Sequence, residues 1–225
     1  MSAFGLGRLP SVDQRDKLYP MRAALPRVAL AKIPARRTWT LSEILDQGET
    51  SRCVGYAWAT KLRCAPIDRT PDPDTLYHGA QRNDEWPGED YEGTSMRGGA
   101  KYLASVKELT EYRWAKNIAD ILDWLAFKGP VVVGTAWRDG MFETDADGLV
   151  NVSGAVAGEH AYCLIGKNDS RQHVTIANSW GYRWGKRTVT HPEGNGRGFM
   201  RYSDLARLVF ERGGEACVAI KSGKR

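Results

Sequence analysis

The hydrophobic pattern of this chain changes its period at Gly129-Pro130, and that change limits the folds that the chain can adopt. Upstream, apolar residues recur at helical spacing, as they do from Asn117 to Lys128. Downstream, short apolar runs rich in β-branched residues alternate with Gly and Asp turns. A helical half followed by a mainly antiparallel β half predicts an α+β fold.

The same pattern predicts individual elements. We expect helices at about residues 51–64, 74–81, 94–105 and 117–128, the third capped by Thr94 or Ser95. We expect strands at about residues 131–133, 161–165, 174–177, 198–202 and 217–220. The first 39 residues hold four Pro and should be extended or irregular, because each Pro disfavours helix at the residue before it.

The composition is that of an ordinary globular protein, with 42% hydrophobic and 26% charged residues among 225. The net charge of +5 is spread along the chain, so we expect no nucleic-acid partner. No run of 18 apolar residues is present, so we expect no membrane span. No signal peptide is visible, which predicts a cytoplasmic location, with association with a phage virion left open. We also expect a monomer.

Four Cys in a chain of this length do not make a disulfide framework. We expect Cys64, Cys163 and Cys217 to be buried thiols, and the sequence leaves a bridge between Cys163 and Cys217 open. The run Asp145–Gly148 resembles part of a calcium loop but lacks the later ligands and the terminal Glu. We therefore expect an acidic turn there, no metal site and no cofactor.

Cys53 lies near the start of the predicted helix at 51–64. The exposed N–H groups and the dipole at a helix N-terminus favour an anion, which lowers the pKa of a thiol there. A buried structural Cys on an apolar helix face is the alternative, and Cys53 alone does not decide between the two.

A reactive thiol needs a base, and the chain has four His. His78, His173 and His191 lie in loops or polar surroundings, whereas His160 opens the apolar run Ala161–Ile165. Asn178 follows the predicted strand at 174–177. From a strand end its side-chain oxygen can accept from an imidazole N–H, which fixes the tautomer and aims the other nitrogen at a nucleophile.

Several motifs together resemble the papain-type cysteine peptidases. Asn178-Ser-Trp-Gly-x-x-Trp-Gly185 is similar to the asparagine motif of that family at every fixed position, and Gly158-Glu-His-Ala161 is similar to its histidine motif. Gln47-Gly48 stands ahead of Cys53 as the family's glutamine does. Gly129-Pro-Val131 resembles the start of its second lobe, and Leu9–Arg15 resembles the N-terminal strand of the mature enzymes.

The resemblance implies a fold and a set of roles. It implies one papain-like domain over residues 1–225: an N-terminal strap at 1–39, a helical lobe at 40–128 and a β-rich lobe at 129–225. Cys53 would be the nucleophile, His160 its base, Asn178 the residue orienting that base, and Gln47 with the Cys53 N–H the oxyanion hole. A polypeptide substrate would meet Gly93, Thr94, Ala161 and Trp180. A selecting pocket would lie near Val133, Gly158 and Ala161.

The chain departs from the family pattern in three places. Thr50 stands where the family has a Cys, so the disulfide beside the nucleophile cannot form. Only eight residues precede Leu9, so we expect no long inhibitory segment, and any latency to come from elsewhere. A Pro- and Arg-rich insertion at about 20–37 is either a surface excursion or, less favoured, a blocking element near the cleft. These features are closest in style to bacterial and phage members.

Two other functions remain open on the same residues. A cell-wall amidase or peptidoglycan endopeptidase also uses Cys and His, although the full asparagine motif argues against it. A non-catalytic binding or virion protein on the same fold is the second alternative. An intact set of Gln47, Cys53, His160 and Asn178 argues against that one.

Overall fold

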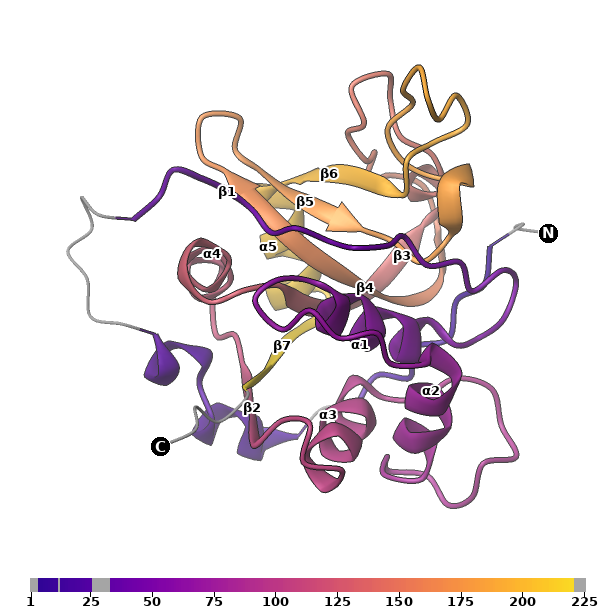
Figure 1. The fold of residues 1–225 in the computed structure, drawn as a ribbon, viewed down its shortest axis with the longest axis vertical. Helices are drawn as coiled ribbons and strands as arrows, with labels where there is room; N and C mark the ends of the chain where they lie inside the picture. Colours follow the sequence, from indigo (N-terminus) through magenta and orange to yellow (C-terminus); the bar gives the residue numbers. More distant parts are fainter. Residues whose placement is uncertain (1–3, 12, 26–32, 221–225) are drawn as a thin grey trace.

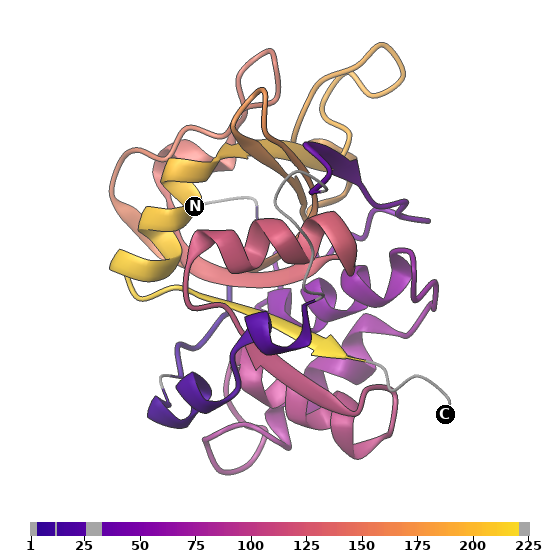
Figure 2. The same cartoon turned by 90° about the vertical axis from the view of Figure 1, so that its left-hand side faces the viewer.

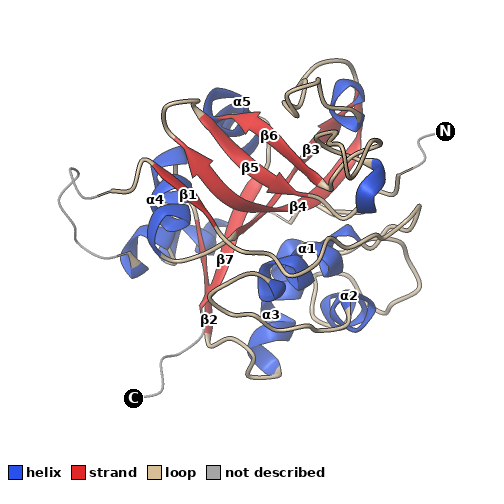
Figure 3. Cartoon of the chain, turned by 45° about the horizontal axis from the view of Figure 1, so that its top comes forward, coloured by secondary structure: helices blue, strands red, loops and turns tan. Residues whose placement is uncertain are grey.

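The computed structural model describes residues 4–11, 13–25 and 33–220 of the chain. Three helices, α1, α2 and α3, lie on one side of an antiparallel sheet, as Figures 1 and 3 show. A view turned by 90° shows α4 against the other side of the sheet (Figure 2). The predicted α+β arrangement is therefore present.

The three helices on the first side pack on one another. They are α1 (Cys53–Arg63), α2 (Pro73–Gln81) and α3 (Met96–Ser105). Asp72 caps α2 and Ser95 caps α3, each by accepting a backbone N–H of the first turn, which selects Ser95 over Thr94 as the cap. Helix α1 is buried along nearly its whole length, because it lies between α2 and the sheet.

The sheet has the strand order β2-β7-β3-β4-β5-β6, with β1 also paired to β4. The strands are β1 (Arg36–Thr38), β2 (Glu111–Trp114), β3 (Val131–Arg138), β4 (Val156–Asn168), β5 (His173–Ala177), β6 (Arg197–Arg201) and β7 (Glu215–Ile220). β4 is the longest, at 13 residues. Its first part pairs with β3 and its last part lies between β5 and β1.

Successive side chains of the sheet enter two different cores, as the alternation of a strand requires. Val132 faces α1 and α3 and packs in a cluster with Cys53 and Ala161. Its neighbours Val131 and Val133 face the opposite core, which contains α4 (Ile118–Phe127) and α5 (Tyr202–Ala206). The sheet thus separates the layer that carries Cys53 from a second apolar layer.

The sequence missed the elements that lack a strong apolar pattern. β1 is exposed along its length, β2 is largely half-buried, and α5 continues into a short π-helix (Arg207–Glu211). Residues 14–18 and 21–24, in the segment expected to be extended or irregular, form short 3₁₀ turns. β1 and β2 lie before residue 129, in the part of the chain assigned to the N-terminal strap and the helical lobe, yet both pair with the sheet. The lobe boundaries expected from the sequence therefore stay a prediction.

The four cysteines are free and buried, as expected for three of them. Cys163 and Cys217 face Val132 from the two neighbouring strands. Two strand spacings put their Cα atoms about 10 Å apart, beyond the roughly 7 Å that a disulfide spans. The bridge that the sequence left open therefore does not form. Within the described residues, no helix is long and apolar enough to cross a bilayer.

Replacing Val132 with Ala should lower the free energy of unfolding by about 2–3 kcal/mol, because it leaves a cavity under α1. The same change at Val189, which is fully exposed, should stay within about 0.5 kcal/mol. Urea denaturation of both variants measures the two effects. Equal losses would contradict the placement of Val132 between α1 and the sheet.

Candidate active site

The N-terminus of α1 points at the middle of β4. Cys53 is the first residue of the helix and is 0% exposed. The backbone N–H of Ala161 lies close enough to the Cys53 sulfur to lower the thiol pKa. The structure thus brings Cys53 next to the strand residue that follows His160.

His160 and Asn178 are joined as the sequence predicted. His160 Nε2 lies 2.8 Å from Asn178 Oδ1, and the same oxygen accepts the backbone N–H of Ser179 at 2.9 Å. Since that oxygen is only an acceptor, Nε2 carries the proton and Nδ1 carries a lone pair. Nδ1 is buried and has no hydrogen-bond partner among the described residues. This tautomer leaves Nδ1 available to take a proton.

Aromatic rings enclose the His160–Asn178 pair. Trp180 stacks on the His160 ring with 4.6 Å between centroids, and Trp137 meets the same ring edge-on at 4.9 Å. Trp180 and Trp137 are both 0% exposed. They exclude water from the hydrogen bond and hold the imidazole plane in place.

Gln47 is held by its side-chain oxygen and presents its side-chain nitrogen. Its Oε1 accepts from Ser179 Oγ at 2.7 Å, which orients the amide. Its Nε2 donates to the Thr50 carbonyl at 2.7 Å and to the Gly5 carbonyl at 3.2 Å. Gln47 therefore donates to a peptide carbonyl of the chain's own N-terminal region.

Residues 4–9, called here the cleft segment, lie across these groups. Gly7 N–H donates to the Glu159 carbonyl at 3.0 Å, and the Gly7 carbonyl accepts the Thr94 N–H at 3.1 Å. Leu9 N–H donates to the Thr94 carbonyl at 2.9 Å, and the Gly5 carbonyl also accepts Trp180 Nε1 at 3.2 Å. The segment thus takes main-chain bonds from both sides of the site and covers it.

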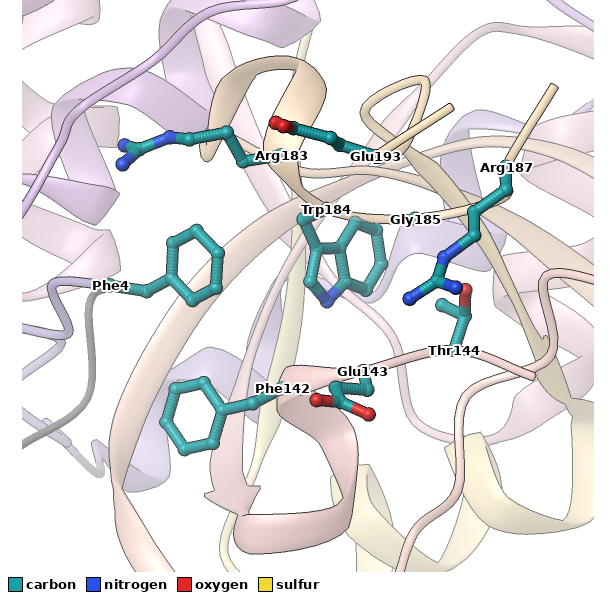
Figure 4. Close-up of a pocket in the computed structure, with 9 residues that line it drawn as sticks. All are labelled: Phe4, Phe142, Glu143, Thr144, Arg183, Trp184, Gly185, Arg187 and Glu193. Atoms are coloured by element: carbon teal, nitrogen blue, oxygen red, sulfur yellow. The ribbon is translucent and has the colours of Figure 1, made fainter. Parts of the chain in front are cut away.

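One end of the cleft segment borders a hollow of about 320 Å³. Phe4 stacks on Trp180 with 4.6 Å between centroids, and Phe142 lies 5.6 Å from Trp180. Figure 4 shows the rings of Phe4 and Phe142 beside Trp184, with Arg187 and Glu143 around it. The hollow therefore lies at the Phe4 end of the cleft segment.

The covered site has titration properties opposite to those expected for an exposed helix terminus. Burial raises the pKa of Cys53 to about 12, although the Ala161 N–H and the Arg8 charge lower it. Burial lowers the pKa of His160 to about 4, although its bond to Asn178 raises it. At neutral pH this closed state holds a thiol and a neutral imidazole rather than an ion pair.

The four residues expected to meet a substrate all lie around the cleft segment. Thr94 pairs with the main chain of the segment, and Gly93 lies against the Gly7 carbonyl. Ala161 adjoins Cys53, and Trp180 stacks on Phe4. A side chain at Gly158 would collide with Leu6. Val133 instead faces the core on the other side of the sheet and does not line the cleft.

The other candidate groups lie elsewhere. His173 stacks on Phe199 at the far end of β5, and His191 stacks on Tyr182 at the surface. No group of three or more metal-ligating side chains occurs among the described residues, and Asp145 caps its own turn. The described part of the 20–37 insertion packs against β2 and along β4, away from the cleft; residues 26–32 lie outside the described residues.

Sequence reasoning missed the residues that hold the cleft segment. Glu159 and Glu215 bind Arg8. The sequence placed Glu159 only within the histidine motif, and Glu215 was overlooked because a lone Glu in a strand carries no pattern of its own. The Gly5-Leu-Gly7 run was the available signal. A Cβ on Gly5 would lie 2.0 Å from the Thr50 carbonyl oxygen, so only Gly lets the chain pass this close.

Known proteins share this fold. Xylellain, a cysteine protease from Xylella fastidiosa, has 18% sequence identity and a TM-score of 0.72, covering 99% of this chain and 98% of its own. Bromelain from Ananas comosus, solved with the E64 inhibitor, has 15% identity and a TM-score of 0.64 over 84% of this chain and 100% of its own. Digestive procathepsin L 3 of Tenebrio molitor has 15% identity and a TM-score of 0.62, over 97% of this chain and 76% of its own.

The family match, together with the fold, identifies a cysteine peptidase. The model described as papain family cysteine protease matches residues 75–195, more than half of the chain. The chain belongs to the papain family of cysteine proteases, which confirms the predicted fold and the predicted class of enzyme. No curated protein sequence matches the chain significantly.

Acid should destabilise the closed state through His160. Its pKa of about 4 lies below the ordinary value of 6.5, so the unfolded chain binds the proton first as pH falls. The stability of the wild type relative to His160→Gln should therefore fall between pH 6.5 and 4, by about 2–4 kcal/mol. Denaturant titrations of both proteins across that range measure it. A pH-independent difference would contradict the burial of a neutral His160.

Proposed function

We propose that the chain hydrolyses peptide bonds with Cys53 as nucleophile, His160 as base and acid, and Asn178 as the residue that orients His160. The observation that carries this proposal is the Nε2–Oδ1 bond of 2.8 Å, which leaves the Nδ1 lone pair of His160 free. The position of the Cys53 sulfur beside Ala161 supports the pairing of thiol and imidazole.

The chemistry follows from these groups. His160 Nδ1 takes the thiol proton, and the thiolate attacks the substrate carbonyl to give a tetrahedral intermediate. His160 then protonates the leaving amine, and water releases the acyl group. Gln47 Nε2 is proposed to stabilise the oxyanion, since it already donates to the Gly5 carbonyl and its own oxygen is held by Ser179.

The proposal includes a closed and an open state. With the cleft segment in place, neither Cys53 nor His160 is exposed, and burial holds each in its neutral form. Displacement of the segment admits water, which favours the charged forms of both groups and returns their pKa values toward each other. Active enzyme is then the open state, and the cleft segment provides the latency.

Labelling with an irreversible thiol-directed epoxide tests the nucleophile. We expect one label per chain on the intact protein, located at Cys53, and none on Cys53→Ala. Cys64→Ala is the matched control and should label like the wild type, because Cys64 is a buried thiol away from His160. Peptide mapping by mass spectrometry locates the label. A label that survives Cys53→Ala would refute the assignment.

Adding a methyl group at Gly5 should open the site. The Cβ would lie 2.0 Å from the Thr50 carbonyl oxygen, so Gly5→Ala cannot keep the cleft segment seated. We expect its rate of epoxide labelling to exceed that of the wild type by about tenfold, equal to roughly 1.4 kcal/mol of lost closure. Labelling time courses give the ratio.

Gly88→Ala is the matched control for that prediction. Gly88 is exposed and has φ +81°, so Ala is strained there, but its Cβ would meet nothing within 4 Å, the cleft segment included. It should label at the wild-type rate. Equal rates for wild type, Gly5→Ala and Gly88→Ala would show that the cleft segment does not limit access to Cys53.

The family match favours a peptidase over a cell-wall amidase or a non-catalytic virion protein. A muralytic zymogram separates the amidase from the peptidase. If Cys53→Ala keeps its cell-wall amidase activity, a nucleophile other than Cys53 carries that activity.

A further inference from the structure

A hollow of about 350 Å³ lies on strands β1, β4, β5 and β6, which are side by side in Figure 3, and it is separate from the catalytic cleft. We call it the cationic hollow, because no Asp or Glu is among the described residues that line it. Four of its cationic side chains form no ion pair within the described part of the chain: Arg36, Arg171, Lys186 and Arg197. The hollow therefore has four positive charges without a partner.

A fifth cation of the hollow is already paired. Lys167 Nζ lies 2.9 Å from Asp169 Oδ2, and the Lys167 side chain is 3% exposed. Its charge is thus balanced inside the protein, and it adds nothing to the four unpaired charges.

One face of the sheet makes the floor of the cationic hollow. Residues directly opposite one another in an antiparallel sheet share a face, and one such row crosses four strands: Thr38, Gly166, Thr175 and Phe199. Gly166 leaves the middle of the row without a side chain. The hydroxyls of Thr38 and Thr175 form no hydrogen bond with any described residue, so both are available to a ligand.

Arg197 lies on the same face, because it is two residues from Phe199 in β6. Its Nε is buried and has no hydrogen-bond partner among the described residues. A buried N–H of a charged group is costly when no acceptor meets it. The guanidinium of Arg197 therefore lacks an acceptor that a ligand in the hollow can supply.

His173 lines the hollow and responds to its charge. Its ring stacks on Phe199 with 4.4 Å between centroids and is 9% exposed. Arg36 and Arg171 lie near it, and Arg201 is opposite it on β6. Burial lowers the pKa of His173, and the charges of Arg171 and Arg36 lower it further. No negative charge opposes these effects, so the positive field of the hollow is uncompensated.

The number and kind of groups match two phosphates. A phosphate monoester carries about −1.5 to −2 charges at neutral pH, so two such groups balance four cations. Guanidinium groups bind phosphate oxygens in pairs, and hydroxyls can donate to the same oxygens. A nucleic acid would instead need a basic stripe that follows its backbone. The four cations surround a single hollow, which favours a small ligand.

We propose that the cationic hollow binds a small molecule that carries a diphosphate group, held by Arg36, Lys186 and Arg197. His173 begins β5 and Asn178 follows its end, so the two sites lie about 16 Å apart along the strand. The proposed binding site goes beyond the peptidase function and does not depend on it.

Thermal unfolding of the full chain with pyrophosphate tests the site. The buffer is free of metal ions, and sodium chloride keeps the ionic strength constant. We expect millimolar pyrophosphate to raise the Tm of the wild type by about 3 °C or more. Arg36→Gln/Lys186→Gln should need at least about tenfold more pyrophosphate for the same rise, because two of the four charges are gone. A wild type whose Tm does not rise would overturn the proposal.

Lys116→Gln/Arg212→Gln is the matched control. Both residues are exposed, neither lines the hollow, and the variant loses the same charge. It should respond to pyrophosphate as the wild type does. If the two double variants lose the response equally, the net charge of the protein rather than the hollow attracts the anion, and the proposal fails.

The titration of His173 locates the bound ligand. Pyrophosphate in the hollow should raise the pKa of His173, because the anion offsets the charges of Arg171 and Arg36. Proton NMR follows the imidazole signals of the four His against pH, and His173→Gln identifies the one that belongs to His173. A Tm rise without any change in the pKa of His173 would place the ligand elsewhere and overturn the proposal.

Two further probes separate the sources of the phosphate groups. Binding of pyrophosphate but not of methyl diphosphate would identify a free diphosphate, and binding of both would admit an ester; either result supports the site. A single-stranded oligonucleotide is the third probe. If it binds more tightly than pyrophosphate and its affinity falls with salt more steeply than four phosphate contacts explain, the partner is a polymer and the proposal is wrong.

Discussion

The packing of α1 on β4 is the contact on which the site depends. Val132, Cys53 and Ala161 lie in one apolar cluster between the helix and the sheet. Because that cluster is closed to water, the first residue of the helix is fixed against the strand that carries His160. The positions of thiol and imidazole are therefore consequences of core packing rather than of surface loops, which suits a site that needs a constant geometry.

The cleft segment, at the N-terminal end of the chain, places a second constraint on the site between α1 and β4. The cleft segment pairs its own main chain with Gln47, Thr94, Glu159 and Trp180, while His160 Nδ1 stays without a partner among the described residues. Its removal exposes donors and acceptors that an extended polypeptide can satisfy in the same way. In the proposed mechanism, latency and substrate binding are two uses of one set of hydrogen bonds.

The sequence predicted best where the pattern was strong. The helix at Cys53, the strand at His160 and the bond from His160 to Asn178 follow from apolar periodicity and from motifs with fixed spacing. β1 and β2 were missed, because an exposed or half-buried strand held by its neighbours needs no apolar pattern. The contacts of Arg8 with Glu159 and Glu215 were invisible, since they join residues 151 and 207 positions apart.

Charge was the other property that sequence could not place. The basic residues are spread along the chain, yet the fold gathers five of them around one hollow of about 350 Å³: Arg36, Lys167, Arg171, Lys186 and Arg197. Likewise, Cys53 was expected to have a lowered thiol pKa because of the helix terminus. In the closed state the effect of burial exceeds that of the helix N-terminus, and the pKa of the Cys53 thiol is raised.

The attachment of the cleft segment to the chain has a consequence for how the enzyme responds to concentration. A tethered ligand competes at a local concentration set by its linker, of millimolar order for a short one. Dilution of the enzyme cannot relieve that competition, as it would for a separate inhibitor. A substrate displaces the segment from the cleft only at high concentration or with high affinity. Turnover should therefore rise steeply only where suitable polypeptide chains are plentiful.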